Sequence, residues 1–344
     1  MLEITNLQVS FTTDAGVAKV LDGINLGVGP GEIMGLVGES GCGKTTLANA
    51  ILGTLPANAR CASGAIRFAG EDLRLLPARR MQDEVRGRRI TFIPQDPVGS
   101  FNPLFTVGAQ GMEVMKWKSP RRAPGEARGI GGLIGGLCSR YPRRRRRADR
   151  EALLQMLRAV QLPGGNDVLR KLPHEFSGGQ RQRLMIALAL LPRPQLVIAD
   201  EPTSALDVTI QAQILKLLKE LAKNTGVSVL FTTHDLGSAY EICDRVTVMY
   251  AGQEVEAAPV DAFFRRPRHP YTARLLASLP RPGRAFSEIG GEIPGPLSPP
   301  SGCRFHPRCA RADATCRLQR PPVEEGDHGH QVRCFHPLEE EWRP

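Results

Sequence analysis

The chain has 344 residues and a formal net charge of +10, with 41% hydrophobic but only 5% aromatic residues. This length suits one large α/β domain with an appendage, or two modest domains, built around an aliphatic core. No run approaches the roughly 18 apolar residues of a membrane helix, and the start, MLEITNLQVSF, lacks the pattern of a signal peptide. We therefore expect a cytoplasmic protein, in which clustered cysteines more often bind metal than form disulfides.

The first predicted elements are strands. In MLEITNLQVSF the apolar pairs Leu2 and Ile4, then Val9 and Phe11, flank a polar break, which indicates a strand, and residues 1–30 are expected to form an antiparallel sheet. The apolar strand EIMGLV (32–37) then leads into GESGCGKT (38–45) and the helical segment LANAIL. Strand, glycine-rich loop and helix follow one another as a phosphate loop of the form G-x-x-x-x-G-K-[ST] requires.

The residue types of this loop suit a nucleotide. Its glycines permit backbone angles that turn successive N–H groups toward phosphate oxygens, and the following helix adds its positive end. Lys44 is expected to reach the β and γ phosphates, and the Thr45 hydroxyl to bind Mg²⁺. Cys42 is interpreted as a contributor of backbone N–H, with a redox switch as the alternative. The expected nucleotide contacts are Gly38, Glu39, Ser40, Gly41, Cys42, Gly43, Lys44, Thr45 and Thr46.

A second segment, QLVIADEPTSALD (195–207), supplies carboxylates. The apolar run is typical of a buried parallel strand, and ligands bind at the carboxyl ends of such strands. Asp200 is expected to serve Mg²⁺, directly or through the second layer of ligands. Glu201 is expected to polarise an attacking water. Together the two segments supply the parts that phosphoryl transfer to water needs: a phosphate cradle, a metal ion and a group that orients the nucleophile.

Several further segments resemble the ATP-binding cassette (ABC) ATPases. EFSGGQRQRLMIALALL (175–191) resembles their signature segment, FIPQDP (92–97) their Q-loop, SALD (204–207) their D-loop and TTHD (232–235) their switch segment. These elements occur in the family's order across residues 1 to about 255. The resemblance implies a catalytic role for Gln95 and His234 beside Glu201, and a further Mg²⁺ contact at Gln95. The nucleotide contacts it implies are Phe11, Ser177, Gly178, Gly179, Gln180 and Asp207.

The resemblance also implies partners. In this family the signature segment of one cassette meets the γ-phosphate held by a second cassette, so one chain carries two half-sites. We therefore expect a second ABC ATPase subunit, identical or different. A chain with one cassette and no membrane span resembles the separate ATPase of a bacterial importer. This resemblance implies two transmembrane permeases and an extracytoplasmic substrate-binding protein as partners. It also implies that the chain lies peripherally on the cytoplasmic face of the membrane.

Three segments narrow the resemblance to the oligopeptide and dipeptide importers. They are QDPVGSFNPLFTVGAQ (95–110), RRPRHPYTARLLASLP (265–280) and the cysteine-rich C-terminal tail. Peptide is the expected cargo, and nickel chelates, glutathione or another small solute are alternatives. A soluble ABC protein acting on nucleic acid is a remote alternative that only the positive charge and the arginine run favour, and an exporter or regulatory cassette is another. No nucleic acid is expected as a partner.

The cysteine tail has the spacing C-x5-C-x6-C-x17-C, formed by Cys303, Cys309, Cys316 and Cys334. Zinc sites usually have shorter gaps, whereas iron–sulfur ligand sets can have wider ones. Related importer subunits carry a [4Fe–4S] cluster on such a tail, and the resemblance implies one here. Zinc stays open because His306, His328, His330 and His336 lie nearby in the sequence, and a disulfide or no metal is a further alternative.

A basic insert covers residues 117–150 and includes RYPRRRRR (140–147). Glycine and proline predict a loop in its first half, with helix returning at 148–162. The arginines are interpreted as a solvated loop, with contact to anionic lipid or nucleic acid as alternatives.

The expected fold is the α/β P-loop NTPase fold of an ABC cassette: a mostly parallel core sheet, an antiparallel β subdomain, a helical subdomain and a small cysteine-rich extension. We assign residues 1–255 to the ATPase domain, with the helical subdomain at about 95–191, and residues 256–344 to the extension. Residues 31–90 and 192–255 are assigned to the core, and helices are predicted at 208–224, 259–265 and 271–278.

Overall fold

A computed structural model describes residues 1–122, 141–279 and 290–339. Two compact units are distinguished, one formed by Met1–Leu76 with Ser228–Pro344 and the other by Pro77–Val227. Part of the basic insert, 123–140, lies outside the described residues. Within the described ranges, no helix is both long and apolar enough to cross a membrane.

The first unit contains an antiparallel sheet in the order β2-β1-β4-β5. Its strands are β1 (Leu2–Thr13), β2 (Gly16–Val28), β4 (Ala59–Phe68) and β5 (Glu71–Asp72). This confirms the antiparallel strands predicted for residues 1–30. The assignment of all of residues 31–90 to the core sheet is wrong, because β4 pairs with β1.

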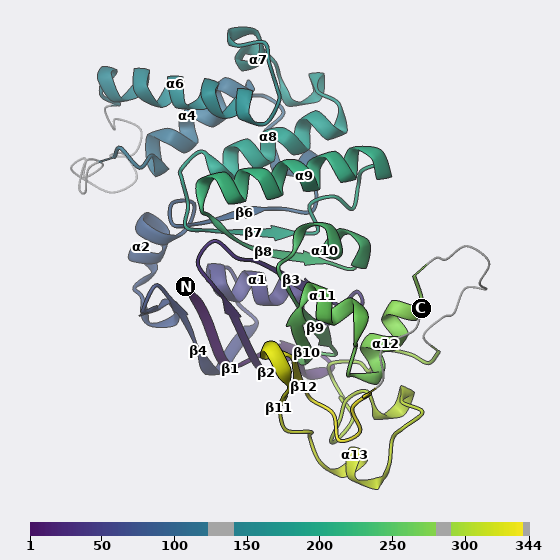
Figure 1. Ribbon diagram of the computed structural model, residues 1–344. Helices are drawn as coiled ribbons and strands as arrows, with labels where there is room; N and C mark the ends of the chain where they lie inside the picture. Colours follow the sequence, from purple (N-terminus) through teal and green to yellow (C-terminus); the bar gives the residue numbers. More distant parts are fainter. Residues whose placement is uncertain (123–140, 280–289, 340–344) are drawn as a thin grey trace. The chain divides into compact units, whose positions relative to one another are not determined.

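The other sheet strands of this unit follow the order β11-β12-β10-β9-β3-β8 (Figure 1). They are β3 (Ile33–Val37), β8 (Ser228–Thr233), β9 (Arg245–Tyr250), β10 (Gln253–Pro259), β11 (Glu324–Glu325) and β12 (Gln331–Val332). Strand β3 is buried along its whole length and pairs in parallel with β8 and β9, as expected for an apolar strand covered on both faces.

The sheet is mixed rather than mostly parallel. Strand β10 is antiparallel to β9, and the C-terminal β12 is antiparallel to β10 and β11. The short turn between β9 and β10 allows only an antiparallel pair, whereas β12 reaches β10 from much later in the chain. The helices of this unit are α1 (Lys44–Leu52), α10 (Leu236–Ile242), α11 (Val260–Arg265), α12 (Pro270–Ala277) and α13 (Ala314–Leu318). The predicted helices at 259–265 and 271–278 correspond to α11 and α12.

The second unit carries the parallel strands β6 (Ile90–Ile93) and β7 (Leu196–Asp200). Its helices are α2 (Ala78–Arg80), α3 (Pro97–Ser100), α4 (Val107–Lys118), α6 (Arg143–Ala159), α7 (Asn166–Arg170), α8 (Gly178–Leu190) and α9 (Val208–Thr225). Helix α6 contacts α4 and α8, and α8 also contacts α9 and β6 (Figure 1). The apolar stripe of α9 is confirmed, with Ile214, Leu217 and Leu218 buried.

The predicted start of the helix at residue 148 is wrong, because α6 begins at Arg143. The arginines from 143 to 147 therefore belong to a helix and not to a loop. Arg145 stacks on Tyr141, with 4.6 Å between its guanidinium carbon and the ring centroid, and pairs with the buried Asp149. These two contacts, each with a residue four positions away, offset the repulsion of positive charges at the positive end of a helix.

Candidate functional site: a phosphate loop, a carboxylate pair and a cysteine pocket

The loop between β3 and α1 requires glycine at defined positions. A Cβ added to Gly38 would lie 2.3 Å from the carbonyl oxygen of Met249, so β9 packs directly against the loop backbone. Gly43 has φ +110°, and its Cβ would lie 2.7 Å from the Leu21 side chain. Gly41 has φ +81° with open space around it. The loop is thus fixed by its own backbone angles and by close packing on β2 and β9.

Lys44 and the start of α1 lie inside this loop. The Lys44 ammonium donates to the carbonyl oxygens of Gly38, at 2.8 Å, and Glu39, at 3.3 Å. Gly43 is the N-cap of α1 and supplies no side chain to cap the first N–H groups. Thr45 is exposed in that first turn and Thr46 is half-buried. A lysine, uncapped N–H groups and an exposed threonine together favour a polyanionic ligand.

Cys42 is a buried thiol within the loop, only 1% exposed. Burial raises its pKa, although the nearby Lys44 opposes the shift. Its carbonyl oxygen accepts from the N–H of Gly252 at 3.0 Å. A protonated, covered thiol is a poor redox centre, so the structure favours the backbone role over the redox switch.

Two other expected residues of the first unit, His234 and Phe11, belong to its two different sheets. Val37 and Thr233 are in register on β3 and β8, so the phosphate loop and His234 begin at the same end of parallel strands. His234 is exposed there. Phe11 lies half-buried on β1, where it pairs with Ala18 of β2 and Ala59 of β4. The sheet register therefore places His234 at the loop's edge and Phe11 on the antiparallel sheet.

In the second unit, Gln95 and Glu201 are in contact. They follow β6 and β7, whose parallel pairing sets Ile93 beside Ala199. The Gln95 amide donates to the Glu201 carboxylate at 3.1 Å. Glu201 has φ +45°, a conformation that costs of the order of 1–3 kcal/mol for a residue other than glycine and occurs often at active sites. Asp200, one residue earlier, is 4% exposed.

The signature segment is held by helix caps. Ser177 Oγ accepts from the N–H of Gln180, and the Gln180 side chain accepts from the N–H of Ser177, a reciprocal capping box at α8. A Cβ on Gly179 would lie 2.7 Å from Ile210 of α9, which explains this glycine; Gly178 is half-buried beside it. Asp207 caps α9 by accepting from the N–H of Ile210 at 3.0 Å.

The four tail cysteines line a single pocket of the first unit. Cys303, Cys309, Cys316 and Cys334 share it with two phenylalanines, His306 and the buried His269. Burial, together with the charges of the other three thiols, raises the pKa of Cys334 to about 12. Four thiols collected in an apolar pocket are a ligand set for a soft metal centre, because a cation is needed to hold them as thiolates.

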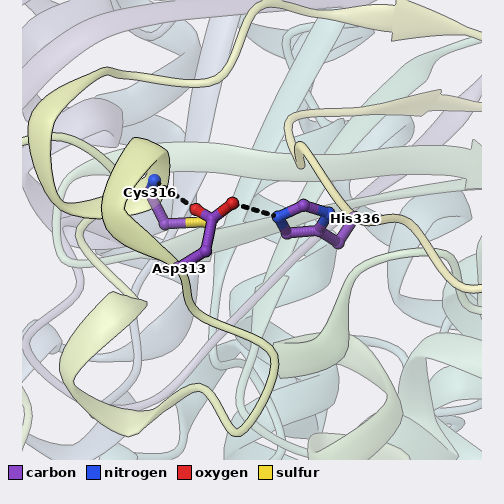
Figure 2. Close-up of side chains that lie close together, drawn as sticks. All are labelled: Asp313, Cys316 and His336. Carbon is purple, nitrogen blue, oxygen red and sulfur yellow. Dashed lines mark hydrogen bonds and ion pairs between the residues drawn. The ribbon is translucent and has the colours of Figure 1, made fainter.

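Figure 2 shows that one histidine of the tail is linked to this group through a carboxylate. Asp313 accepts from the Cys316 N–H at 2.8 Å and pairs with Nε2 of His336 at 2.9 Å. The ligand atoms of Asp313, Cys316 and His336 lie within 4.8 Å of one another. His330 instead contacts the buried Glu256, at 2.7 Å. His306 and His336 line the cysteine pocket, whereas His328 and His330 do not, so the zinc alternative rests on the first two.

Sequence reasoning missed Arg308, Arg304 and the roles of His269 and Tyr271. The buried Arg308 forms an ion pair with the half-buried Glu39 of the phosphate loop, at 3.0 Å. The Tyr271 hydroxyl accepts from the Glu39 N–H at 3.2 Å. Two features of the sequence could have indicated these residues: an arginine directly before Cys309, and the HPYT segment. The sequence analysis interpreted the HPYT segment only as a mark of the importer family.

The phosphate loop, the Asp-Glu pair and the capped signature segment define the ATPase cassette of an ABC transporter. The family model described as "ABC transporter" matches residues 21–204, and that of the "Oligopeptide/dipeptide transporter, C-terminal region" matches residues 255–316. A dimeric ATP-binding cassette, solved in a post-hydrolysis state with ADP and Pi, aligns with TM-score 0.60 and 25% identity over 76% of this chain and 99% of that one.

Sequence relatives extend over nearly the whole chain. The dipeptide transport ATP-binding protein DppD of Bacillus subtilis is 40% identical over 97% of this chain and 94% of its own length. The oligopeptide transport ATP-binding protein OppD of Escherichia coli is 40% identical over 99% and 94%. A probable peptide ABC transporter ATP-binding protein of Sinorhizobium fredii is 43% identical over 97% and 94%. The chain belongs to the ABC transporter ATP-binding proteins of the oligopeptide/dipeptide family.

Proposed function

We propose that the protein is the ATP-binding and ATP-hydrolysing subunit of an importer that takes up dipeptides or oligopeptides. The observation that carries this proposal is a phosphate loop with Lys44 at its centre in a chain whose C-terminal region matches the oligopeptide/dipeptide transporter model. The relatives named for dipeptide and oligopeptide transport favour peptide over nickel, glutathione or another solute. The chain's place would be the cytoplasmic face of the membrane.

The phosphate loop would bind the nucleotide through its own backbone and side chains. The first N–H groups of α1 and the Lys44 ammonium would hold the phosphate oxygens, and Phe11 would stack on the base. The exposed Thr45 hydroxyl fits a Mg²⁺ ligand, with Asp200 and Gln95 as the other protein ligands proposed. The ion, when bound, would offset phosphate charge.

Glu201 is the group proposed to accept a proton from the attacking water. The hydrogen bond from Gln95 orients the Glu201 carboxylate. His234, at the end of β8, would contact the γ-phosphate. Asp207 and the Ser177–Gln180 end of α8 would contact the nucleotide that is bound to a second cassette. Two permeases and an extracytoplasmic binding protein would complete the importer.

A Glu201→Gln variant tests this assignment. It preserves the size and the hydrogen-bonding capacity of the side chain but removes its basicity. We expect ATP binding near the wild-type affinity and a loss of about 100-fold or more in hydrolysis by the assembled complex. Asp167→Asn, an exchange on the exposed surface of α7, is the control and should leave both unchanged. Wild-type turnover by Glu201→Gln would remove Glu201 from this role.

We further propose that the cysteine pocket holds a [4Fe–4S] cluster with a structural role. Four thiols in one pocket provide the ligand number for such a cluster. His269 adds a suitable donor: its Nδ1 accepts from the Tyr271 N–H, which leaves the proton on Nε2, and this buried Nε2 has no hydrogen-bond partner among the described residues. Hydrogen bonds to sulfur are a common part of the surroundings of such clusters.

Metal analysis of anaerobically purified protein tests the cluster. We expect a brown protein with about four iron and four acid-labile sulfide per chain. A Cys316→Ser variant should lose both, whereas Cys61→Ser, which changes a cysteine outside the tail, should keep them. A colourless protein that contains zinc would refute the cluster and support the zinc alternative, in which His336 or His306 would be a ligand.

Contact of the basic insert with anionic lipid stays a prediction. Arg143, Arg144, Arg146 and Arg147 are exposed on α6, and each could contribute about 1 kcal/mol near a charged surface. Binding to nucleic acid is disfavoured by the family to which the chain belongs.

A further inference from the structure

We propose that the cysteine-rich tail supports the nucleotide site. Arg308 and Arg304 of the tail position the phosphate loop, so the affinity for nucleotide depends on whether the cysteine pocket holds its metal. This proposal rests on the ATP site proposed above. It concerns contacts within the first unit alone, where the tail and the phosphate loop both lie.

Arg308 forms an ion pair with Glu39, the second residue of the phosphate loop. Its two terminal nitrogens lie 3.0 and 3.3 Å from the two carboxylate oxygens, a bidentate arrangement. The side chain of Arg308 is 3% exposed and that of Glu39 is 24% exposed. Arg308 also donates to the Tyr250 hydroxyl at 3.3 Å, and Tyr271 accepts from the Glu39 N–H. Both the side chain and the backbone of Glu39 are therefore fixed from outside the loop.

Arg304 reaches the loop by a second route. It pairs with Asp22 of β2 at 2.8 Å and donates to the carbonyl oxygen of Ala251, in the turn between β9 and β10. The next residue of that turn, Gly252, donates its N–H to the carbonyl oxygen of Cys42 at 3.0 Å. Arg304 thus stabilises the turn whose Gly252 is hydrogen-bonded to Cys42 of the phosphate loop.

The cysteine pocket determines where these arginines lie. Arg304 directly follows Cys303 and Arg308 directly precedes Cys309, so each loop contact is adjacent to a proposed metal ligand. The segment is short of apolar residues apart from Phe305, which packs on Tyr250 and Tyr271 with centroid distances of 5.2 and 5.3 Å. Such a segment is ordered largely by its metal, because ligand binding supplies the free energy that a small core cannot.

Charge gives the direction of the effect. Glu39 places a carboxylate in the loop that would bind the negative phosphates, and Arg308 neutralises it at close range. Without Arg308 the carboxylate would repel the nucleotide and the loop would lose a fixed point. Replacing Glu39 by glutamine removes the repulsion, so the effect of an Arg308 substitution should shrink in that background.

Binding of a fluorescent ATP analogue to the purified full-length protein with Mg²⁺ tests the proposal. We expect Arg308→Gln to weaken binding about tenfold, and Arg308→Lys, which keeps the charge but loses the bidentate geometry, to weaken it less. In a Glu39→Gln background, Arg308→Gln should change affinity by less than about twofold. Arg317→Gln is the matched control, since Arg317 also adjoins a cysteine, Cys316, but is exposed; it should bind as the wild type does.

Metal content is measured in each variant, so that loss of the cysteine site is not mistaken for loss of the arginine contact. Arg308→Gln with full metal content and wild-type affinity would overturn the proposal while leaving the proposed function intact. A wild-type protein that binds no ATP analogue would instead refute the proposed function. If Arg308→Gln does not fold, Arg308→Lys and the Glu39→Gln background carry the same test.

Linkage supplies a second readout that does not use turnover. If an occupied cysteine pocket favours nucleotide binding, bound nucleotide must favour occupancy by the same factor. At equilibrium, saturating Mg–ADP should therefore raise the chelator concentration that removes half of the tail's metal from the wild type and from Arg317→Gln. In Arg308→Gln this protection should be reduced. Equal protection in all three proteins would contradict the proposed coupling.

Discussion

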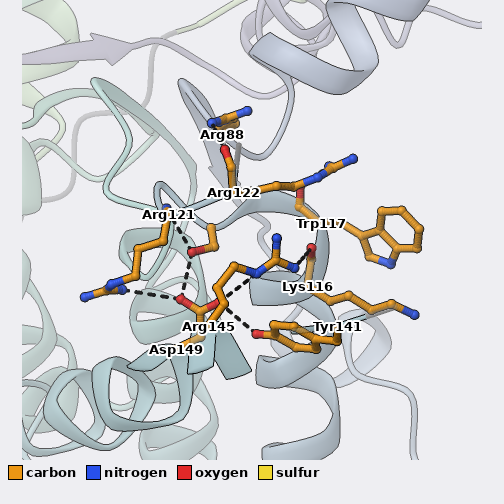
Figure 3. Close-up of polar contacts among 9 residues, drawn as sticks. Arg88, Lys116, Trp117, Arg121, Arg122, Tyr141, Arg145 and Asp149 are labelled. Carbon is orange, nitrogen blue, oxygen red and sulfur yellow. Dashed lines mark hydrogen bonds and ion pairs between the residues drawn. The ribbon is translucent and has the colours of Figure 1, made fainter. Parts of the chain in front are cut away.

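Asp149 is expected to hold the helical part of the second unit together. Figure 3 shows it at the centre of a polar cluster between α4 and α6. It is fully buried and accepts from the hydroxyls of Ser119, at 2.7 Å, and Tyr141, at 2.8 Å. Arg121 and Arg145 lie 3.4 and 3.6 Å from its oxygens. The Asp149→Ala variant removes the common partner of all four groups.

The size of the effect follows from these contacts. A buried donor left without an acceptor costs about 1–3 kcal/mol, and removing one partner of a buried ion pair costs about 3–5 kcal/mol. The donors share one carboxylate, so these costs overlap. We expect Asp149→Ala to lower the free energy of unfolding of this unit by about 3–5 kcal/mol. Asp149→Asn should cost roughly half as much, since it retains one acceptor oxygen.

Urea unfolding, followed by far-UV circular dichroism and by tryptophan fluorescence, to which Trp117 in α4 contributes, measures this change. Asp83→Ala is the matched control. Asp83 pairs with Arg79 at the same i,i+4 spacing as Arg145 and Asp149, but the side chain of Asp83 is 55% exposed, so its loss should cost under about 1 kcal/mol. Equal unfolding midpoints for Asp149→Ala and Asp83→Ala would show that burial of the cluster does not set its contribution.

Two further predictions concern the first unit. Burial lowers the pKa of His269 from 6.5 to about 4, so the unfolded chain takes up the proton first. Urea unfolding should show that the free energy of unfolding rises by about 3 kcal/mol from pH 4 to pH 6.5 and stays level at higher pH. An equal rise with pH in the His269→Gln variant would contradict this assignment. Gly38→Ala, whose Cβ would meet Met249 at 2.3 Å, should abolish ATP-analogue binding and lower the melting temperature. Gly41→Ala, with open space around it, is the control and should melt at a higher temperature than Gly38→Ala.

Local chemistry made the phosphate loop predictable. The strand, the glycine positions and the helix are encoded within residues 32–52, and the backbone angles of Gly41 and Gly43 are properties of the loop itself. The same holds for Ser177 and Gln180, whose capping box spans four residues. The sequence also placed Glu201 at a strand end, although its hydrogen bond with Gln95 depends on the parallel pairing of β6 with β7.

The onset of α6 shows where local reasoning failed. Five successive arginines at the positive end of a helix are unfavourable by themselves, and a loop was predicted. The contacts of Arg145 with Tyr141 and Asp149, and with the carbonyl oxygen of Lys116 in α4, reverse that preference. No pattern in the sequence states that Asp149 would be buried.

By itself, the sequence determined the class of the protein and the residues proposed to handle ATP, since short contiguous motifs encode both. It also determined the four cysteines as a group, through their spacing along the tail. Only the tertiary structure decided that the tail joins the nucleotide-binding unit. Strand β12 pairs with β10, and Arg308 meets Glu39 across 269 positions of sequence. Contacts between such distant residues arise from packing and from the pairing of buried charges, which no periodicity or spacing along the chain records.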